Sequence, residues 1–151
     1  MPSMRSCLRE FCAKYLTISV WKRWPYCPLE NLGVAAHAVE QVPHDRGDVA
    51  VVIGCRPIGI MAAQTLVAQR VNVVLIDMVK PRLAMAAEIS SGTVVDINQE
   101  NPVDKISEMT NGKGAAFVLE AAGPQSALDQ ALDLVKTRGT VVTNGLYRER
   151  G

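Results

Sequence analysis

Residues 49–59 read VAVVIGCRPIG, and this stretch decides the fold. The unbroken apolar run at 49–53, rich in β-branched residues, predicts a strand that is covered on both faces. Gly54 follows the run and offers a tight turn. Pro57 comes next, where a helix can begin, because a proline at the first helical position loses no intrahelical hydrogen bond. The stretch therefore predicts the start of a β-α-β unit in a parallel sheet.

The rest of the chain repeats this alternation. Because such alternation is typical of an α/β fold with right-handed crossovers, we expect a Rossmann-type doubly wound parallel sheet of five strands in the order 3-2-1-4-5. A sixth strand, which such a sheet often has, is expected to be missing. The expected strands are 49–53, 72–76, 93–97, 116–119 and 140–143, and the expected helices are about 32–42, 57–69, 79–88, 101–110 and 124–136.

The turn after the first strand resembles the glycine fingerprint G-x-G-x-x-G of dinucleotide-binding folds. Gly54 and Gly59 match its first and third glycines, and Arg56 takes the place of the second, which normally lets the backbone approach a pyrophosphate. Asp77 closes the second expected strand, at the spacing of the acid that binds the adenosine ribose. This acid favours NAD over NADP. The alternative is that Asp77 only caps the helix that begins near residue 79.

Composition excludes several other classes of function. The 151 residues, 48% of them hydrophobic, suffice for one ordinary core, and 16 basic against 15 acidic residues leave a net charge of +1. No overall field would attract nucleic acid or an anionic membrane. The four cysteines show neither a zinc-ligand spacing nor a disulfide framework, so we expect a reducing, cytoplasmic location.

Three regions are expected along the chain. Residues 1–28 form an unclassified N-terminal extension, which holds both tryptophans and three of the four cysteines. Residues 29–147 form the dinucleotide-binding domain, and residues 148–151 form a polar tail. The free edge of the sheet allows a homodimer.

Several motifs together are similar to the cofactor domain of zinc-dependent medium-chain alcohol and polyol dehydrogenases, the branch of sorbitol, xylitol and threonine dehydrogenases. The resemblance implies an NAD-binding domain of an enzyme that transfers hydride between a secondary alcohol and nicotinamide. The motifs are Glu30-Asn31-Leu32, His37-Ala38, VVIGCRPIG at 51–59, Asp77 with Arg82-Leu83, GKGA at 112–115, EAAG at 120–123 and Asn144-Gly145-Leu146.

The resemblance also implies which residues hold the cofactor. Asp77 and Arg82 would lie at the adenosine end and the glycine turn under the pyrophosphate, whereas the nicotinamide end would be lined by residues after the fourth and fifth strands. The implied cofactor-binding residues are Gly54, Cys55, Arg56, Pro57, Ile58, Gly59, Asp77, Arg82, Ala121, Ala122, Gly145 and Leu146.

The zinc site of the family is represented by a single residue. Glu30 matches the glutamate of the Glu-Pro-Leu motif, beside the catalytic zinc in polyol-type members. The other metal ligands and the proton-relay residues belong to an N-terminal domain that residues 1–28 do not resemble. A zinc site needs three protein ligands and an open position, so we expect this chain to bind no zinc and to catalyse no alcohol oxidation by itself.

Three arginines replace glycines that the family usually has: Arg56, Arg70 and Arg138. Where such a glycine is left-handed, an L-residue costs about 1–2 kcal/mol. The Arg56 side chain either blocks the approach of the phosphates or pairs with them. The alternative to a working cofactor domain is therefore a truncated or decayed homologue that keeps the fold with weak or no nucleotide binding.

Two further residues have a simpler interpretation. Cys55 lies at a helix N-terminus, where a thiolate can be stabilised, but this position of the turn accepts any small residue. Glu120 ends the fourth expected strand, and we expect its carboxylate to fix the following loop by hydrogen bonds to backbone amides rather than to act in catalysis.

Overall fold

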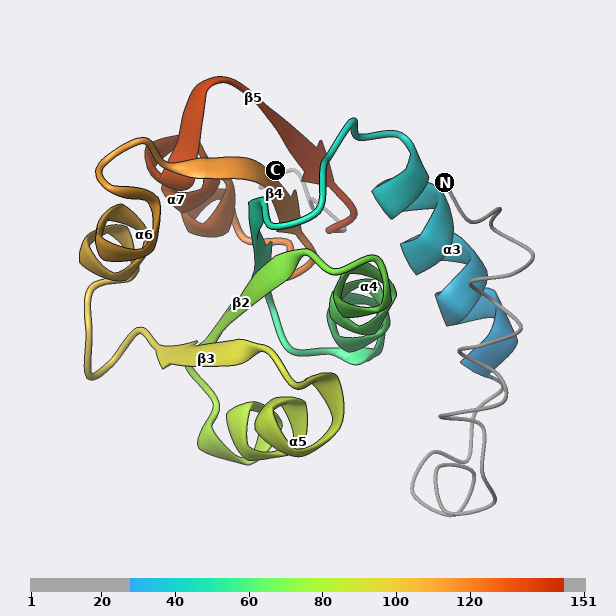
Figure 1. Cartoon of the computed structure of the whole chain (residues 1–151). Coiled ribbons are helices and arrows are strands. Elements are labelled where there is room, and N and C mark those ends of the chain that lie inside the picture. The colour runs from blue at the N-terminus through green and yellow to red at the C-terminus, as the bar shows by residue number, and fades with distance from the viewer. Residues whose placement is uncertain (1–27, 146–151) are drawn as a thin grey trace, which may run out of the picture.

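The computed structural model describes residues 28–145, and these fold into one parallel sheet with helices on both faces (Figure 1). The five strands have the order β3-β2-β1-β4-β5, as the sequence predicts. The elements are α3 (Pro28–Glu40), β1 (Val49–Ile53), α4 (Pro57–Ala68), β2 (Asn72–Asp77), α5 (Lys80–Ser90), β3 (Thr93–Asp96), α6 (Pro102–Thr110), β4 (Ala115–Glu120), α7 (Gln125–Leu134) and β5 (Val135–Thr143).

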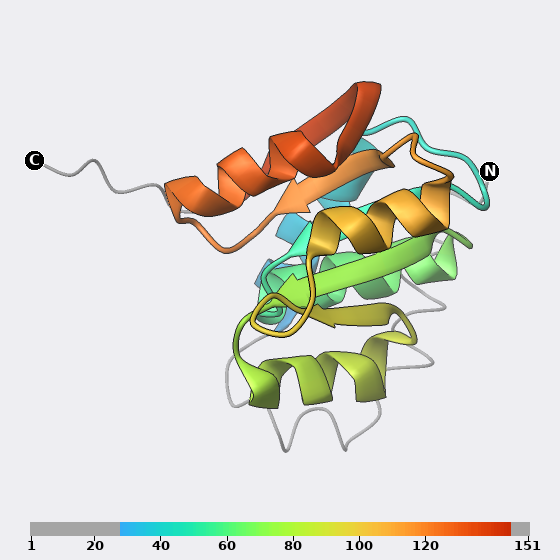
Figure 2. The same ribbon diagram turned by 90° about the vertical axis from the view of Figure 1, so that its left-hand side faces the viewer.

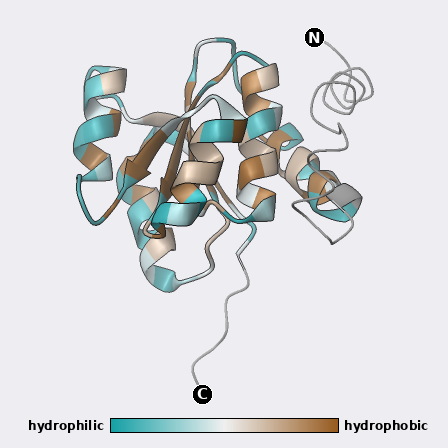
Figure 3. Cartoon of the chain, turned by 90° about the horizontal axis from the view of Figure 1, so that it is seen from below, coloured by the Kyte–Doolittle hydropathy of each residue, from teal (hydrophilic) through white to brown (hydrophobic). Residues whose placement is uncertain are grey.

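The helices divide between the two faces of the sheet. α3, α4 and α5 share one apolar cluster with the strands, and α6 and α7 share a second cluster on the opposite face. Figure 2 looks onto the face that α6 and α7 cover, and Figure 3 shows apolar strands enclosed by helices whose outer surfaces are polar. This two-sided cover explains why the sequence of β1 is apolar at every position.

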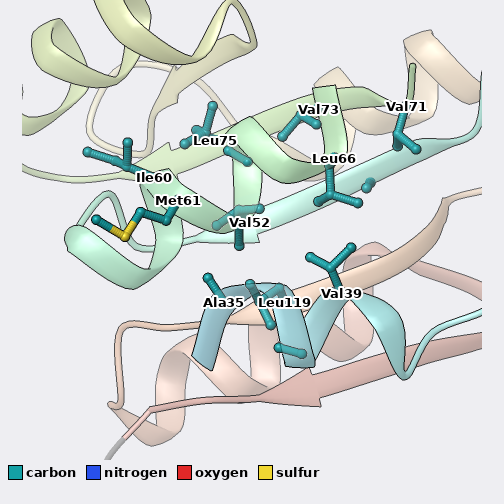
Figure 4. Packing of buried hydrophobic residues seen from close by; sticks show 14 of the residues in the cluster. Ala35, Val39, Val52, Ile60, Met61, Leu66, Val71, Val73, Leu75 and Leu119 are labelled. Carbon is teal, nitrogen blue, oxygen red and sulfur yellow. The ribbon is translucent and has the colours of Figure 1, made fainter. Parts of the chain in front are cut away.

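The core lies where β1 and β2 pack against α3 and α4. Val52 of β1 and Leu66 of α4 are fully buried, and Leu75 of β2 and Val39 of α3 lie in the same cluster (Figure 4). Neighbouring residues of β1 pack on opposite faces of the sheet, because Val52 belongs to the first cluster and Val51 to the second. Burying such a side chain contributes about 1.5–3 kcal/mol, so the central strands hold the sheet together.

Prolines mark the helix starts, as expected. Pro57 and Pro102 are the first residues of α4 and α6, and Pro81 is the second residue of α5. Pro124 is the residue before α7. The first helix differs from the expected 32–42, because it begins at Pro28, again with proline at its first position, and ends at Glu40.

The prediction was wrong where the last helix meets the last strand. The expected helix ran to residue 136, but α7 ends at Leu134 and β5 begins at Val135 instead of residue 140. Val135 pairs with Ala115 before the register shifts between Ala115 and Phe117. A Cβ on Gly114 would lie 2.9 Å from the Lys136 amide nitrogen, so the absence of a side chain there lets the two backbones meet. This long-range contact overrides the local helical pattern.

Two of the three arginines have left-handed backbones. Arg70, just after α4, has φ 65°, and Arg138 within β5 has φ 64°, a backbone conformation that favours glycine. Arg56 differs, with an extended backbone at φ −87° and ψ 175°. The strain expected from replacing a glycine therefore applies at Arg70 and Arg138 but not at Arg56.

Strand β5 is an open edge of the sheet. It pairs with β4, and its residues are half-buried or exposed, whereas β4 is almost fully buried. A homodimer through this edge stays a prediction. None of the helices in the described part of the chain is long and apolar enough to cross a membrane.

Candidate nucleotide-binding site

The carboxyl ends of β1, β2 and β4 meet at one edge of the sheet. The Gly54 amide donates to the Ile76 carbonyl at 2.8 Å, and the Ala121 amide donates to the Ile53 carbonyl at 2.9 Å, so the bonding between the strands continues into the loops. The chain leaves β1 toward β2 on one side, while β4 pairs with β1 on the other. In open α/β sheets, ligands bind at such a switch point.

The two glycines of the fingerprint are required by contacts. A Cβ on Gly59 would lie 1.9 Å from the Gly54 carbonyl oxygen, which leaves no room for any side chain. Gly54 has φ 102°, and a Cβ there would lie 3.0 Å from the Ala122 amide nitrogen. The glycine turn is thus packed between the start of α4 and the loop after β4.

Arg56 lies at the exposed part of this turn. Gly54 and Cys55 before it are buried, whereas Arg56 is exposed and precedes the first residue of α4. Its carbonyl accepts a hydrogen bond from the Ile60 amide at 3.0 Å, which closes the first turn of the helix.

Asp77 fixes the geometry between β1 and β2. Its Oδ2 accepts a hydrogen bond from the Cys55 amide at 2.7 Å, and its Oδ1 accepts from the amides of Met78 and Val79 at 2.8 and 2.9 Å. Arg82 lies 3.9 Å from Oδ2. Asp77 therefore stabilises the turn before α5, but it does not cap the helix as the alternative interpretation proposed, because Val79 is the N-cap residue and no side chain caps α5. It also holds the glycine turn, which neither interpretation included.

Cys55 is not a reactive thiol. Its side chain is 2% exposed. Burial, assisted by the negative charge of Asp77 and opposed by the positive charge of Arg82, raises the pKa of the Cys55 thiol from 9.0 to about 12. At neutral pH the sulfur is a neutral packing group, as the simpler interpretation predicted.

Glu120 has the structural role expected of it. It is fully buried, and its Oε1 accepts hydrogen bonds from the amides of Ala122 and Gly123 at 2.7 and 2.6 Å. A Cβ on Gly145 would lie 2.5 Å from Oε2 and 2.5 Å from the Gly123 Cα. The carboxylate and Gly145 thus join the loop after β4 to the end of β5.

A cleft of about 260 Å³ opens above these strand ends. Five of its lining residues were predicted from the sequence. Its apolar rim was missed; the rim includes Met78 and Ile97, which are 58% and 36% exposed. Large apolar side chains directly after strand ends were the signal that could have revealed them. The lining residues are Ile53, Gly54, Arg56, Ile76, Asp77, Met78, Val79, Arg82, Ile97, Ala122, Pro124, Ser126, Ala127 and Gln130.

The other expected site residues lie around the cleft or away from it. The cleft is not lined by Cys55 of the turn or by Pro57, Ile58 and Gly59 in the first turn of α4. Ala121 and Gly145 lie in the neighbouring loops, also without lining the cleft. Leu146 lies outside the described residues.

The described residues do not fit a zinc ion. Between residues 28 and 145, no three histidine, cysteine, aspartate or glutamate side chains are grouped so that they could hold a metal. Glu30 is exposed in the first turn of α3. One carboxylate cannot form a tetrahedral zinc site, so residues 28–145 by themselves do not supply the ligands that zinc needs.

Comparison with known proteins identifies the family. The zinc-binding dehydrogenase family matches residues 57–151. The chain belongs to this family. Its members are dehydrogenases that use a nicotinamide dinucleotide.

Individual relatives agree with this assignment. The sorbitol dehydrogenase of Halalkalibacterium halodurans is 31% identical over 122 residues, which cover 80% of this chain and 36% of the relative. The L-threonine 3-dehydrogenase of Bacillus subtilis is 38% identical over 112 residues, covering 73% and 32%. Among solved structures, the alcohol dehydrogenase TADH from Thermus sp. ATN1 superposes with a TM-score of 0.74 at 32% identity, covering 80% of this chain and 35% of that one. The chain thus spans about a third of the length of these zinc-binding dehydrogenases.

Proposed function

We propose that the cleft binds a nicotinamide dinucleotide, and that the chain supplies the cofactor domain of an alcohol or polyol dehydrogenase. The observation that carries the proposal is the meeting of the glycine turn and Asp77 at the carboxyl ends of β1 and β2, beside the cleft. Both glycines are packed without room for side chains, which fixes the path of the turn beside the cleft. The cofactor, when bound, supplies hydride transfer.

The expected roles can be assigned within this cleft. Asp77 and Arg82 would hold the adenosine ribose. The apolar rim formed by Met78 and Ile97 would surround the adenine base. The glycine turn would lie under the pyrophosphate. Ala122, held by Glu120, would lie toward the nicotinamide, with Ala121 and Gly145 in the neighbouring loops.

We propose NAD over NADP as the preferred cofactor. Asp77 is a buried carboxylate at the cleft, and its remaining acceptor capacity suits the ribose hydroxyls of NAD, while its charge would repel a 2′-phosphate. Three backbone amides and Arg82 partly offset that charge, so we expect a preference of moderate size.

The test compares Asp77→Asn with the matched control Asp96→Asn. Asp96 ends the adjacent strand β3 and accepts similar turn hydrogen bonds from Asn98, but it does not line the cleft. Isothermal titration of NAD and NADP should show that Asp77→Asn narrows the NAD preference about tenfold, or about 1.4 kcal/mol. Asp96→Asn should leave the preference unchanged. An unaltered ratio for Asp77→Asn would contradict the assignment of Asp77 to the ribose.

Turnover requires groups outside the described residues. Residues 28–145 show no cluster that could hold a metal, and the chain spans about a third of its relatives. We propose that alcohol oxidation needs a catalytic domain in addition to residues 28–145.

The second candidate is a decayed homologue that keeps the fold without useful cofactor affinity. Arg56 favours it, because a side chain occupies the place of the fingerprint's second glycine. The NAD titration separates the two candidates, since a failure of the wild-type chain to bind NAD at millimolar concentration would support decay.

A further inference from the structure

We propose that the Arg56 guanidinium is a phosphate-binding group of the cleft, so that recognition of the pyrophosphate depends on a side-chain cation instead of close approach to a glycine backbone. The inference rests on the proposed function, because it assigns a role within the same cleft.

The backbone of Arg56 accommodates a side chain without strain. Its φ of −87° and ψ of 175° are an extended conformation that any L-residue adopts. The neighbouring glycines are different, since Gly54 has φ 102° and Gly59 has no room for a Cβ. Arginine is therefore tolerated at position 56 without a change in the path of the turn.

Arg56 lies on the cleft side of the turn. Cys55 before it is buried beneath the turn, whereas Arg56 is exposed and lines the cleft. Its flexible stem can move the guanidinium away from the space directly above the turn, which a pyrophosphate would occupy.

The charges of the cleft leave Arg56 available to an anion. The other charged lining residues are Asp77 and Arg82, which lie 3.9 Å apart. Within residues 28–145 the second ion pair joins Lys105 to Glu108, so neither pair engages Arg56. The carboxylate of Asp77 accepts three backbone amides in addition to its contact with Arg82. Of the two arginines that line the cleft, Arg82 lies beside a carboxylate and Arg56 does not.

The start of α4 adds to the positive potential at this position. Arg56 is the residue before the helix, and the first amides of α4 have no acceptor inside the helix. A phosphate beside the turn would meet these amides together with the guanidinium. Charge-assisted, bidentate hydrogen bonds from arginine to phosphate are among the strongest that proteins form.

The experiment titrates adenosine, ADP and NAD into the wild-type chain, Arg56→Gln and Arg56→Gly at low and high salt. Arg70→Gln is the matched control, because Arg70 is an exposed arginine at the other end of α4 and does not line the cleft. We expect Arg56→Gln and Arg56→Gly to weaken ADP and NAD binding about tenfold and to leave adenosine binding unchanged. Added salt should weaken wild-type ADP binding more than that of the Arg56 variants.

Three other outcomes would overturn the inference in different ways. If wild type binds NAD but Arg56→Gly binds it equally or more tightly, Arg56 obstructs the phosphates or ignores them, and the proposed function stands. If wild type binds neither NAD nor ADP, the proposed function fails and the role of Arg56 fails with it. Equal losses in Arg70→Gln would show that any surface arginine contributes, which also contradicts a specific role.

Discussion

The two ends of α4 carry arginines, Arg56 and Arg70, whose backbones differ although the sequence resemblance implies glycine at both positions. At the start, Arg56 has an ordinary extended backbone, and the packed glycines are its neighbours Gly54 and Gly59. At the end, Arg70 is exposed and has a left-handed backbone at φ 65°. The difference teaches that a glycine can be required by a contact, by a dihedral angle, or by a ligand that approaches it. Each requirement predicts a different result of mutation.

The largest effect is expected for Gly59→Ala, which tests the requirement by contact. The new Cβ would lie 1.9 Å from the Gly54 carbonyl oxygen, a backbone atom that can move only if the whole turn shifts. We expect a loss of about 2–4 kcal/mol in the free energy of unfolding, measured by urea denaturation. Gly33→Ala is the control, because a Cβ there meets nothing within 4 Å. A loss below 1 kcal/mol would show that the turn is compliant.

A second prediction concerns Cys55, inside the same packed turn. With its pKa raised from 9.0 to about 12, the thiol stays protonated in the folded chain well above pH 9. In a variant whose cysteines 7, 12 and 27 are replaced by serine, the native protein at pH 9 should react with a thiol reagent about 500-fold more slowly than the unfolded protein, from ionisation alone.

The same pKa shift gives a sign for stability against pH. A raised folded-state pKa of a thiol favours the neutral form, so its contribution to stability is fully present below pH 9 and is lost as pH rises from 9 toward about 12. Cys55→Ser should lessen this loss of stability, measured by urea denaturation between pH 8 and 10.

The prediction of slow labelling would be contradicted by a rapid reaction of native Cys55 with the thiol reagent at pH 9. Such a reaction would show that the turn opens readily.

The smallest effect is expected for Arg70→Gly, which tests the requirement by dihedral angle. Glycine removes the cost of about 1–2 kcal/mol that an L-residue incurs in a left-handed backbone, but it also adds conformational entropy to the unfolded chain. We therefore expect the free energy of unfolding to rise by about 0.5–1 kcal/mol. The hydrogen bonds of Arg70 to Gly47 and Val67 are backbone bonds and are kept. Arg70→Ala keeps a Cβ and should bring no gain. Equal gains from both variants would assign the effect to the side chain's charge.

Local sequence carried much of the fold and part of the site. The apolar runs and helix-start prolines predicted every element within residues 28–145, and the position of Asp77 at the end of β2 was predicted as well. The start of β5 was missed, because Val135 follows a helical pattern and becomes a strand through pairing with Ala115. The apolar rim of the cleft was missed because Met78 and Ile97 lie in the loops after β2 and β3, and only the pairing of these strands in the sheet brings the two loops together.

The alternation of strands and helices, the strand order and the location of the glycine turn could all be predicted from the sequence alone. These follow from short-range periodicity and from the right-handedness of crossovers, which act between neighbouring elements. The tertiary structure was needed to show that Asp77 accepts from the Cys55 amide and that Arg56 is extended where Arg70 is left-handed. The physical reason is that these features depend on contacts between segments far apart in the chain, and no local pattern records which backbone atoms the sheet will bring within hydrogen-bonding distance.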